Sequence, residues 1–531
     1  MGLLLNLIRQ VAGRRTPSRA RDEQVALPDS TGASADQTAR VILEKCERLE
    51  HELQGLCATG QRATALALVV ARCPRPSTAA QAQMLMRRIV LPLVEACAAH
   101  GDAAVACQVE QAVFGHLVKR FEDPTHFEVC LGMIDRPMHQ LGKIDRLPIE
   151  PLAANGANKL LFFLHNLGND FAHTLLLVDV VEAYLTIHPA LAHTVGVAGV
   201  CGETASPAIR GLAARWKIPV HRLQERDGLH GPLQDTAALL ASGAYDRVIV
   251  VSVPIAISYL TGLLPSSRVG WLTMKYQLSC FDHLRLRCSF RSGLRREQTV
   301  DGRVWLQAAP LFNGRTSLSA NTDTSPVLKQ ARHHKIVVYT INREEKIRHP
   351  RFLDRVARIL ERVDGSVFVW TGRERLPEID AHFAARGLQD RHLFAGWVTP
   401  DDLLQTGDLF LDTPVLSGNV AAQATALGIP VVTDSDAITW VGTFLPAYLA
   451  DRGTAAVAHL DALIGPLQAE GIHLQCAGDD QYVDQAVRLA QNGQLRRKFG
   501  QALESFARHY FFDAGRSATD HFENLRAPIV E

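Results

Sequence analysis

Apolar side chains recur at helical spacing through the first third of the chain, over residues 39–148. The pattern is clearest in the segments ARVILEKCERLEHELQGLCATG, QAQMLMRRIVLPLVEACAAHGD and AAVACQVEQAVFGHLVKRF. Residues three and four positions apart share one face of an α-helix, so each segment carries an apolar stripe that a neighbour must cover. The pattern predicts an all-α domain of several helices over residues 39–148.

A different pattern begins near residue 149 and predicts a first Rossmann-like lobe over residues 149–330. Short apolar runs alternate with amphipathic segments, and the runs are NKLLFFLHN, TVGVAGV, YDRVIVVSVP and SSRVGWLTM. Such runs are typical of strands buried on both faces of a parallel sheet, with helices between them. Residues 291–334 are polar and mixed, and we expect them to form the crossing to a second lobe.

The same alternation restarts and predicts a second Rossmann-like lobe over residues 331–531. Its strand-like runs are HKIVVYTIN, GSVFVWTG, HLFAGW, DLFLDTP and IPVVTD, and one closing helix is expected over DQAVRLAQNGQLRRKFGQALESFARHYFF. The predicted fold class is therefore α/β, with two Rossmann-like lobes that face a cleft behind the all-α domain. Open α/β sheets bind ligands at the carboxyl ends of their strands, so the candidate chemistry is sought there.

Residues 1–38 carry neither pattern. Residues 12–38 are rich in polar side chains and poor in large apolar ones, which is typical of a disordered lead. The opening MGLLLNLIRQVAGRR is too short to span a bilayer and lacks the features of a secretory signal. We expect a frayed terminus, and a weak amphipathic contact with a membrane surface is the alternative.

Charge and cysteine usage narrow the class of protein. The formal net charge is +1, which argues against a nucleic-acid binder, because such proteins usually carry a basic excess. Ten cysteines are scattered without a CxxC pair, so we expect a reducing, cytoplasmic setting and no structural zinc. No stretch is long and apolar enough to predict a membrane span. The sequence lacks a GxxxxGK[ST] loop, a GxGxxG after the first strand and an HExxH motif, and we expect no DxD metal signature. This argues against NTPases, ordinary dehydrogenases and metal-dependent transferases.

Two candidate catalytic residues lie where the first strand turns into the first helix, in HNLGND followed by FAHT. Gly168 permits a tight turn, and Asp170 can cap the helix. His173 lies in the first helical turn, and imidazole is the side chain best suited to proton transfer near neutral pH. We predict catalytic roles for His173 and Asp170, with a structural histidine and a capping aspartate as the alternative.

A run of charged residues follows the first strand of the second lobe, in YTINREEKIRHP. Asn342, Arg343 and Lys346 lie between the end of this strand and the next helix. Cationic side chains at such a position can clamp a pyrophosphate and stabilise the charge of a departing nucleotide. We predict donor binding by these three residues, with a solvated charge run as the alternative.

A second phosphate-binding candidate is LDTPVLSGNVAAQATALGIPVV, residues 411–432. The strand leaves Asp412 at its end, and a turn then opens a helix. Successive amides at a helix start bind phosphate without side chains, and a glycine there allows close approach. We predict that Asp412 binds the donor and that the donor-binding turn is formed by Gly418, Asn419, Val420 and Ala421.

A glycine follows each of two further predicted strands, in the segments FVWTGRER and FAGWV. Gly372 and Gly396 are natural edges of a nucleotide slot, since a glycine lets a ligand approach the backbone closely. Trp397 and Val398 are predicted to line the base pocket, with a core position for Trp397 as the alternative.

These second-lobe segments together resemble the nucleotide-binding lobe of GT-B glycosyltransferases. The resemblance is closest to the O-GlcNAc transferase group and the related bacterial cytoplasmic adhesin N-glucosyltransferases. It covers residues 335–435 well and residues 155–290 loosely. The resemblance implies an enzyme that binds a UDP-sugar between two Rossmann lobes, uses no metal and inverts the anomeric centre.

The resemblance also implies roles for individual residues. Asn342 and Lys346 match the motif whose lysine contacts the donor diphosphate. The turn that holds the same diphosphate is matched by Gly418, Asn419, Val420 and Ala421. His173 matches a histidine in the first βα loop of the catalytic lobe.

The sequence departs from the group in three places. Asn419, Val420 and Ala421 stand where the group carries His-Thr-Thr, so two hydroxyl groups are missing. The acidic residue that holds the ribose falls at or beside Gln423 and Ala424. A GHPATT-like stretch is not visible in the first lobe.

We therefore predict a metal-independent glycosyltransferase that moves a hexose or N-acetylhexosamine from a UDP-sugar to an acceptor, with a protein side chain as one candidate acceptor. No cofactor beyond the donor is expected. One alternative is a sugar-nucleotide epimerase, which needs carboxylates in the cleft, and the candidates are Asp170, Glu203 and Asp412. The other alternative is a non-catalytic nucleotide-sugar-binding scaffold, which the missing hydroxyls favour.

Overall fold

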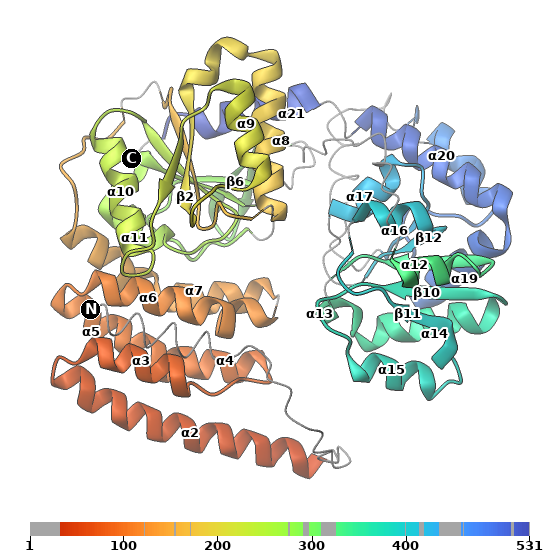
Figure 1. Cartoon of the computed structure of the whole chain (residues 1–531), viewed down its shortest axis with the longest axis horizontal. Helices are drawn as coiled ribbons and strands as arrows, with labels where there is room; N and C mark the ends of the chain where they lie inside the picture. Colours follow the sequence, from red (N-terminus) through yellow and green to blue (C-terminus); the bar gives the residue numbers. More distant parts are fainter. Residues whose placement is uncertain are drawn as a thin grey trace.

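The fold is seen in a computed structural model (Figure 1). It describes residues 32–121, 123–152, 156–169, 171–273, 277–289, 297–308, 325–342, 344–398, 400–413, 419–434, 458–459, 461–510 and 514–529. Residues 1–31 of the predicted disordered or amphipathic lead lie outside the described residues. The first helix begins at Gly32, whereas the sequence predicted that the helical domain begins at residue 39.

A stack of helices precedes the first sheet, as the apolar periodicity predicts. Its members are α2 (Gly32–Ala58), α3 (Arg62–Arg72), α4 (Ala79–Leu85), the π-helix η1 (Met86–Val90), α5 (Leu91–His100), α6 (Ala103–Val113), the π-helix η2 (Phe114–Val118), the 3-10 helix η3 (Lys119–Phe121) and α7 (Pro124–Ile144).

The first lobe is built on a sheet whose strands are ordered β3-β2-β1-β4-β5-β6-β8-β7. Its strands are β1 (Leu160–Leu164), β2 (Val195–Val200), β3 (Val220–Leu223), β4 (Arg247–Val251), β5 (Val269–Thr273), β6 (Leu286–Ser289), β7 (Glu297–Val300) and β8 (Arg303–Gln307). Its helices are α8 (Ala172–Ile187), η4 (Pro189–Thr194), α9 (Pro207–Trp216), α10 (His230–Ala241), α11 (Ile257–Leu263) and η5 (Ser266–Arg268). Every pairing is parallel except the β7–β8 hairpin.

The prediction that residues 291–334 cross between the lobes is wrong for residues 297–307, which form this hairpin. Asp301 and Gly302 make its turn with φ angles of 47° and 73°. Two successive positive φ angles are what a two-residue hairpin turn requires, and an Asp-Gly pair favours them. The signal was present in the sequence, but it was hidden by the polar residues around it.

The second lobe is built on a wholly parallel sheet of order β11-β10-β9-β12-β13. Its strands are β9 (Ile336–Thr340), β10 (Ser366–Trp370), β11 (His392–Phe394), β12 (Leu409–Leu411) and β13 (Val431–Val432). Its helices are α12 (Pro326–Ala331), α13 (Glu344–Ile347), α14 (Pro350–Arg362), α15 (Pro377–Ala384), η6 (Gln389–Arg391), α16 (Pro400–Thr406), α17 (Asn419–Ala426), α19 (Gly478–Gln491) and α20 (Gly493–Tyr510).

The single closing helix that we expected is two helices. The first, α19, ends at Gln491, and α20 begins at Gly493. Asn492 lies between them, and its side-chain oxygen accepts hydrogen bonds from the amides of Gln494 (3.1 Å) and Leu495 (3.0 Å). An asparagine that satisfies these amides starts a new helix, so the break is encoded locally.

The last helix, α21 (Ala514–Arg526), packs against the first lobe rather than the second, beside α8 (Figure 1). The ring of Phe522 stacks on that of Tyr184, with centroids 3.7 Å apart. Arg526 donates hydrogen bonds to the Tyr184 hydroxyl (2.5 Å) and the Thr194 hydroxyl (2.7 Å). The chain therefore returns to its first lobe after completing the second.

Strand β1 shows how the first sheet is covered on both faces. Leu161 and Phe163 belong to the core shared with the N-terminal helices. Leu160, Phe162 and Leu164 belong to the opposite core, which includes side chains of α8 and α21. Successive side chains of a strand point to opposite faces, so one apolar run serves two cores.

The N-terminal helices are joined closely to this lobe. Helix α7 crosses α11 at two glycines, and a Cβ atom at Gly142 would lie 2.1 Å from the Tyr259 carbonyl oxygen. A Cβ atom at Gly262 would lie 2.1 Å from the His139 carbonyl oxygen. Nearby, both carboxylate oxygens of buried Glu110 accept from the Ala256 amide at 3.2 Å, and burial raises the pKa of this carboxyl to about 7.

We expect Gly142→Ala to lower the free energy of unfolding by about 1–3 kcal/mol, because the methyl group meets backbone atoms that cannot turn aside. Urea denaturation measures this change. Gly211→Ala is the control, since Gly211 lies in α9 with nothing within 4 Å of its Cβ position. It should leave stability unchanged or raise it by up to about 1 kcal/mol. Equal effects of the two substitutions would contradict the close crossing of α7 and α11.

Candidate functional site

The carboxyl ends of β9, β10 and β11 lie at one edge of the second sheet, because these strands are parallel neighbours. Hydrogen bonds tie the loops that follow them. The Thr371 hydroxyl donates to the Asn342 carbonyl oxygen (3.1 Å), and the Gly372 amide donates to the Gly396 carbonyl oxygen (3.2 Å). Two of the predicted donor-binding residues, Asn342 and Gly372, are therefore held in one linked set of loops.

Glu344 strengthens this link, although we did not single it out from the sequence. It is buried in α13, and its carboxylate accepts from the Arg373 amide at 3.1 Å. A Cβ atom at Gly372 would lie 3.1 Å from the same carboxylate oxygen. The close approach of Glu344 therefore favours glycine at position 372 in addition to the nucleotide-slot role that the sequence predicts.

Lys346 lies two residues after Glu344 in the same short helix and is 8% exposed. A buried lysine is rare in a solvated charge run, so this position argues against the alternative interpretation. Arg343 lies outside the described residues. So do Asp170 and Gly418, and their predicted roles stay predictions.

The end of β12 belongs to a second network. The carboxylate of Asp412, 1% exposed, accepts from the Thr433 hydroxyl at 3.0 Å. The carbonyl oxygen of Asp412 accepts from the Tyr482 hydroxyl at 2.9 Å. Asp412 is therefore fixed by β13 on one side and by α19 on the other.

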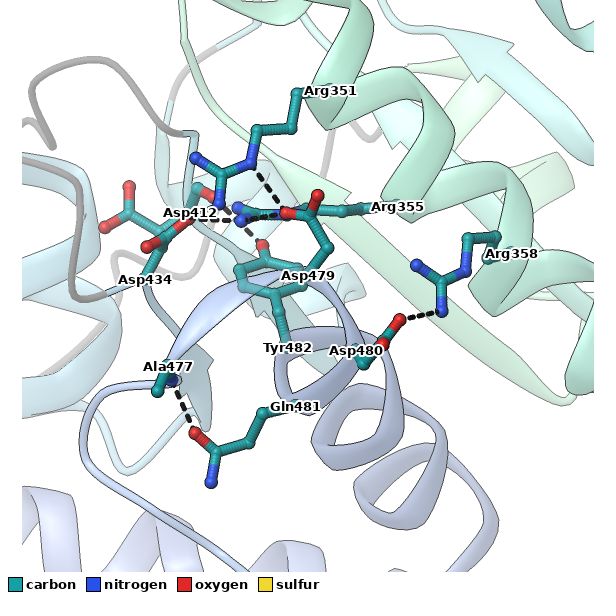
Figure 2. Close-up of polar contacts among 10 residues, drawn as sticks. All are labelled: Arg351, Arg355, Arg358, Asp412, Asp434, Ala477, Asp479, Asp480, Gln481 and Tyr482. Atoms are coloured by element: carbon teal, nitrogen blue, oxygen red, sulfur yellow. Dashed lines mark hydrogen bonds and ion pairs between the residues drawn. The ribbon is translucent and has the colours of Figure 1, made fainter.

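Arg355 lies at the centre of this second network (Figure 2). Its guanidinium carbon lies 4.6 Å from the Tyr482 ring centroid and over the ring face, which is a cation–π contact. The guanidinium also pairs with Asp434 and donates to Asp479 at 2.6 Å. Arg351, one turn earlier on α14, donates to the same Asp479 at 2.6 Å.

The paired charges hold the carboxyl end of β13 and the start of α19 against α14. Arg355 and Asp434 are each 1% exposed, so neither charge is solvated and each depends on its partners. The expectation that the sequence has no DxD signature is wrong, because Asp434 opens an Asp-Ser-Asp run over 434–436. Its carboxylate is occupied here by arginine.

Helix α17 begins at Asn419, where the sequence predicts the phosphate-binding turn. The side chain of Ala421 is 1% exposed and that of Ala424 is fully buried, and both pack in the core of the second lobe. Val420 is partly buried against that core. Any ligand contact by Ala421 must therefore be made by its backbone amide.

Trp397 is 74% exposed, which excludes the alternative that placed it in the core. It follows Gly396, whose φ is +69°, at the carboxyl end of β11. Val398 is partly buried and packs on the core. A large aromatic face open to solvent beside the linked loops is available to stack on a planar ligand.

His173 lies in the first turn of α8, as predicted, after Phe171 as the N-cap residue. Burial is the main cause that lowers its pKa, to about 4, and electrostatic interactions with His165 and Lys119 add to this effect. The same causes, burial first and then Lys119, lower the pKa of His165 to about 4. Both imidazoles are therefore neutral at pH 7 and able to accept a proton.

His165 belongs to the same sequence motif but is not one of the predicted catalytic residues. It is the first residue after β1, and its ring centroid lies 5.7 Å from that of His173. The signal that could have found it is simple: it is the first polar side chain after a buried strand. Arg355 also had a signal, because it interrupts the apolar stripe of α14 between Phe352 and Ile359.

The described part of the chain carries neither a membrane-spanning helix nor a cluster of metal-ligand side chains. There, none of the helices combines the length and apolar character that a bilayer crossing demands. The same residues contain no group of three or more His, Cys, Asp or Glu side chains arranged to hold a metal ion.

Comparison with known proteins gives a match in structure only. No protein-family model matches the sequence, and no curated protein matches it. A mutant of the Thermobaculum terrenum O-GlcNAc transferase matches with a TM-score of 0.50 and 13% identity, over 91% of this chain and 97% of that chain. Anabaena HepE in complex with UDP and glucose matches with a TM-score of 0.47 and 13% identity, over 69% of this chain and 100% of that chain.

A Listeria monocytogenes protein named for UDP-N-acetylglucosamine 2-epimerase activity is a more distant match. Its TM-score is 0.39 at 15% identity, over 71% of this chain and 99% of that chain. The likeness to the O-GlcNAc transferase confirms the predicted fold class, in which two parallel sheets with Rossmann-like helices follow a helical N-terminal part. It also confirms, for the fold, the resemblance inferred from the second-lobe segments.

We expect Arg355→Met to lower the free energy of unfolding by about 3–5 kcal/mol, because it leaves the buried Asp434 carboxylate without its main partner. Denaturant titration gives the change. Arg358→Met is the matched control on the same helix, since Arg358 pairs with Asp480, whose side chain is 87% exposed. The control should cost less than about 1 kcal/mol. A cost as small for Arg355→Met would mean that the buried cluster does not stabilise this lobe.

Proposed function

We propose that this chain is a glycosyltransferase that moves a hexose or N-acetylhexosamine from a UDP-sugar to an acceptor. The observation that carries the proposal is the linked set of loops at the carboxyl edge of the second sheet. The residues whose motif resembles a donor-binding site, Asn342 and Gly372, lie in it, and Lys346 is buried in α13, the short helix that follows Asn342. The structural likeness to an O-GlcNAc transferase over most of the chain supports the same assignment.

The donor would bind to the second lobe. Lys346, with Arg343, would neutralise the charge that develops on the UDP leaving group. The amides of Gly418, Asn419, Val420 and Ala421 would hold the same diphosphate. Trp397 would stack on the base, and Asp412 would keep the end of β12 in place.

The acceptor would bind to the first lobe. His173, which is neutral at pH 7, would take the proton from the acceptor's hydroxyl or amide group as that group attacks C1 of the sugar. The bond from C1 to the phosphate oxygen breaks, and its electron pair leaves with UDP. Direct attack in this way inverts the anomeric centre. The residues named need no metal and no cofactor beyond the donor, and Asp170 is the second candidate for this proton transfer.

We also propose a cytoplasmic setting, since all ten cysteines are free thiols. A protein side chain remains our candidate acceptor, because one of the structural matches is an O-GlcNAc transferase. The epimerase alternative predicts a free epimer of the donor, whereas a transferase predicts a glycosylated acceptor, so product analysis separates them. Donor binding without turnover would instead point to the scaffold.

We expect Lys346→Ala to weaken the binding of UDP about 10-fold to 100-fold, because a charge-assisted contact contributes about 1.5–3 kcal/mol. Calorimetric titration with UDP, UDP-glucose and UDP-GlcNAc measures the affinity. Lys329→Ala is the control, since Lys329 is an exposed lysine of the same lobe, on α12. If neither the wild type nor the control binds any of the three ligands, the proposed donor is wrong.

The lowered pKa of His173 predicts an unusual pH profile. The imidazole acts as a base only while neutral, and with a pKa of about 4 it stays neutral well below its ordinary value of 6.5. We expect UDP release from UDP-sugars to remain level from about pH 8 to about pH 5 and to fall as the pH approaches 4. His173→Gln should remove this turnover. A fall centred near pH 6.5 would show that His173 is not the base in this buried state.

A further inference from the structure

Three polar atoms in the segment from His165 to Thr174 are buried and have no hydrogen-bond partner among the described residues. They are Nδ1 of His165, Nε2 of His173 and the hydroxyl oxygen of Thr174. A buried polar atom without a partner costs about 1–3 kcal/mol, and native structures contain few of them. A group of three within ten residues therefore calls for an explanation in the chemistry of the site.

The two imidazoles stand close together at the carboxyl edge of the first sheet. His165 follows β1, a central strand that pairs with β2 and β4, and His173 follows on α8. Their ring centroids are 5.7 Å apart, and the ring of Phe171 lies 5.6 Å from that of His173 on another side. The edge of a parallel sheet at this end is where such folds bind ligands.

Both rings of the pair are neutral at pH 7, which decides the kind of ligand group that they can hold. Burial and the nearby Lys119, which η3 contributes from the N-terminal helices, both lower the pKa of each ring. A neutral imidazole offers one N–H donor and one lone pair. Two such rings suit a group that can both donate and accept a hydrogen bond, such as a hydroxyl or a carboxamide, better than they suit a carboxylate.

Two exposed apolar side chains lie at the start of α8, next to His173 in the chain. Phe171 is 43% exposed and Leu175 is 39% exposed, and the two are four residues apart at the start of α8. Residues at this spacing lie on one side of a helix. An acceptor with an apolar group next to its reacting hydroxyl or carboxamide would cover Phe171 and Leu175.

We propose that His165 is a second functional imidazole of the acceptor site, which positions the acceptor's hydroxyl or carboxamide group by a hydrogen bond while His173 removes its proton. This inference rests on the proposed glycosyltransferase function. In the step, the acceptor oxygen or nitrogen forms a bond with C1 of the sugar, its proton moves to Nε2 of His173, and UDP leaves with the electron pair of the broken bond. His165 itself gains and loses no proton.

The test uses the relation between stability and turnover. If His165 were only a structural residue, replacing it would lower stability and activity together. If the unpartnered nitrogen serves a ligand, an apolar replacement removes a buried unsatisfied atom, so stability should be kept while activity falls. His165→Leu should therefore leave the urea midpoint unchanged or higher, lower the turnover of UDP-sugar at least about 10-fold, and leave UDP affinity within about twofold.

Two further variants make the experiment specific. His165→Gln keeps a side chain that can hydrogen-bond, so its turnover should lie between that of His165→Leu and the wild type. His193→Leu is the control, because His193 is exposed and lies before β2, at the opposite end of the sheet. Turnover is measured as UDP released from UDP-glucose and UDP-GlcNAc, with and without peptide acceptors, and UDP affinity by calorimetry.

The proposal is overturned if His165→Leu turns over at the wild-type rate, or if its turnover and its stability fall together. It is also overturned if the glutamine and leucine variants are equally inactive. Failure of the proposed function looks different, because the wild-type protein itself would then bind no UDP or release none from either UDP-sugar.

Discussion

Burial of both faces of the first parallel sheet is the constraint on which the rest of this structure depends. A strand such as β1 has no polar face, so each of its side chains must enter one of two cores. Helices α10 and α11, with the N-terminal helices packed behind them, cover one face, and α8, α9 and α21 cover the other. The helical part is therefore a structural layer of the first lobe, and the chain end must return from the second lobe to complete the opposite layer. With both faces covered, the carboxyl edges of the strands are left to carry the polar side chains.

Buried polar groups lie at these edges in both lobes, and each lobe leaves some of them without a hydrogen-bond partner among the described residues. In the second lobe, Arg355 is matched by two carboxylates and an aromatic ring, and the loops after β9, β10 and β11 are joined to one another. In the first lobe, the nitrogens of His165 and His173 are left without partners among the described residues.

Much of the fold could be predicted from the sequence, because strands and helices are encoded by the local pattern of apolar residues. Every strand run singled out in the second lobe is a strand, since β9, β10 and β12 are uninterrupted apolar runs. The misses are local as well: β3 carries no such run, and the hairpin turn at Asp301 was masked by its polar surroundings. The candidate site was only partly readable. Asn342, Gly372 and His173 follow strands and were found, whereas Glu344, Tyr482 and Arg355 were not, because their importance comes from residues far away in the chain.

The sequence by itself determined which segments are strands, which are helices, and hence the two-lobed fold, because these depend on the period of apolar residues within about a dozen positions. It also placed His173 and Lys346 at strand ends. Only the tertiary structure decided which side chains meet. The Tyr482 hydroxyl reaches the Asp412 carbonyl across 70 residues, and Arg526 reaches Tyr184 across 342. No periodicity reports such pairs, because they arise when packed layers bring distant segments together, and the same packing leaves the two histidine nitrogens buried without a partner among the described residues.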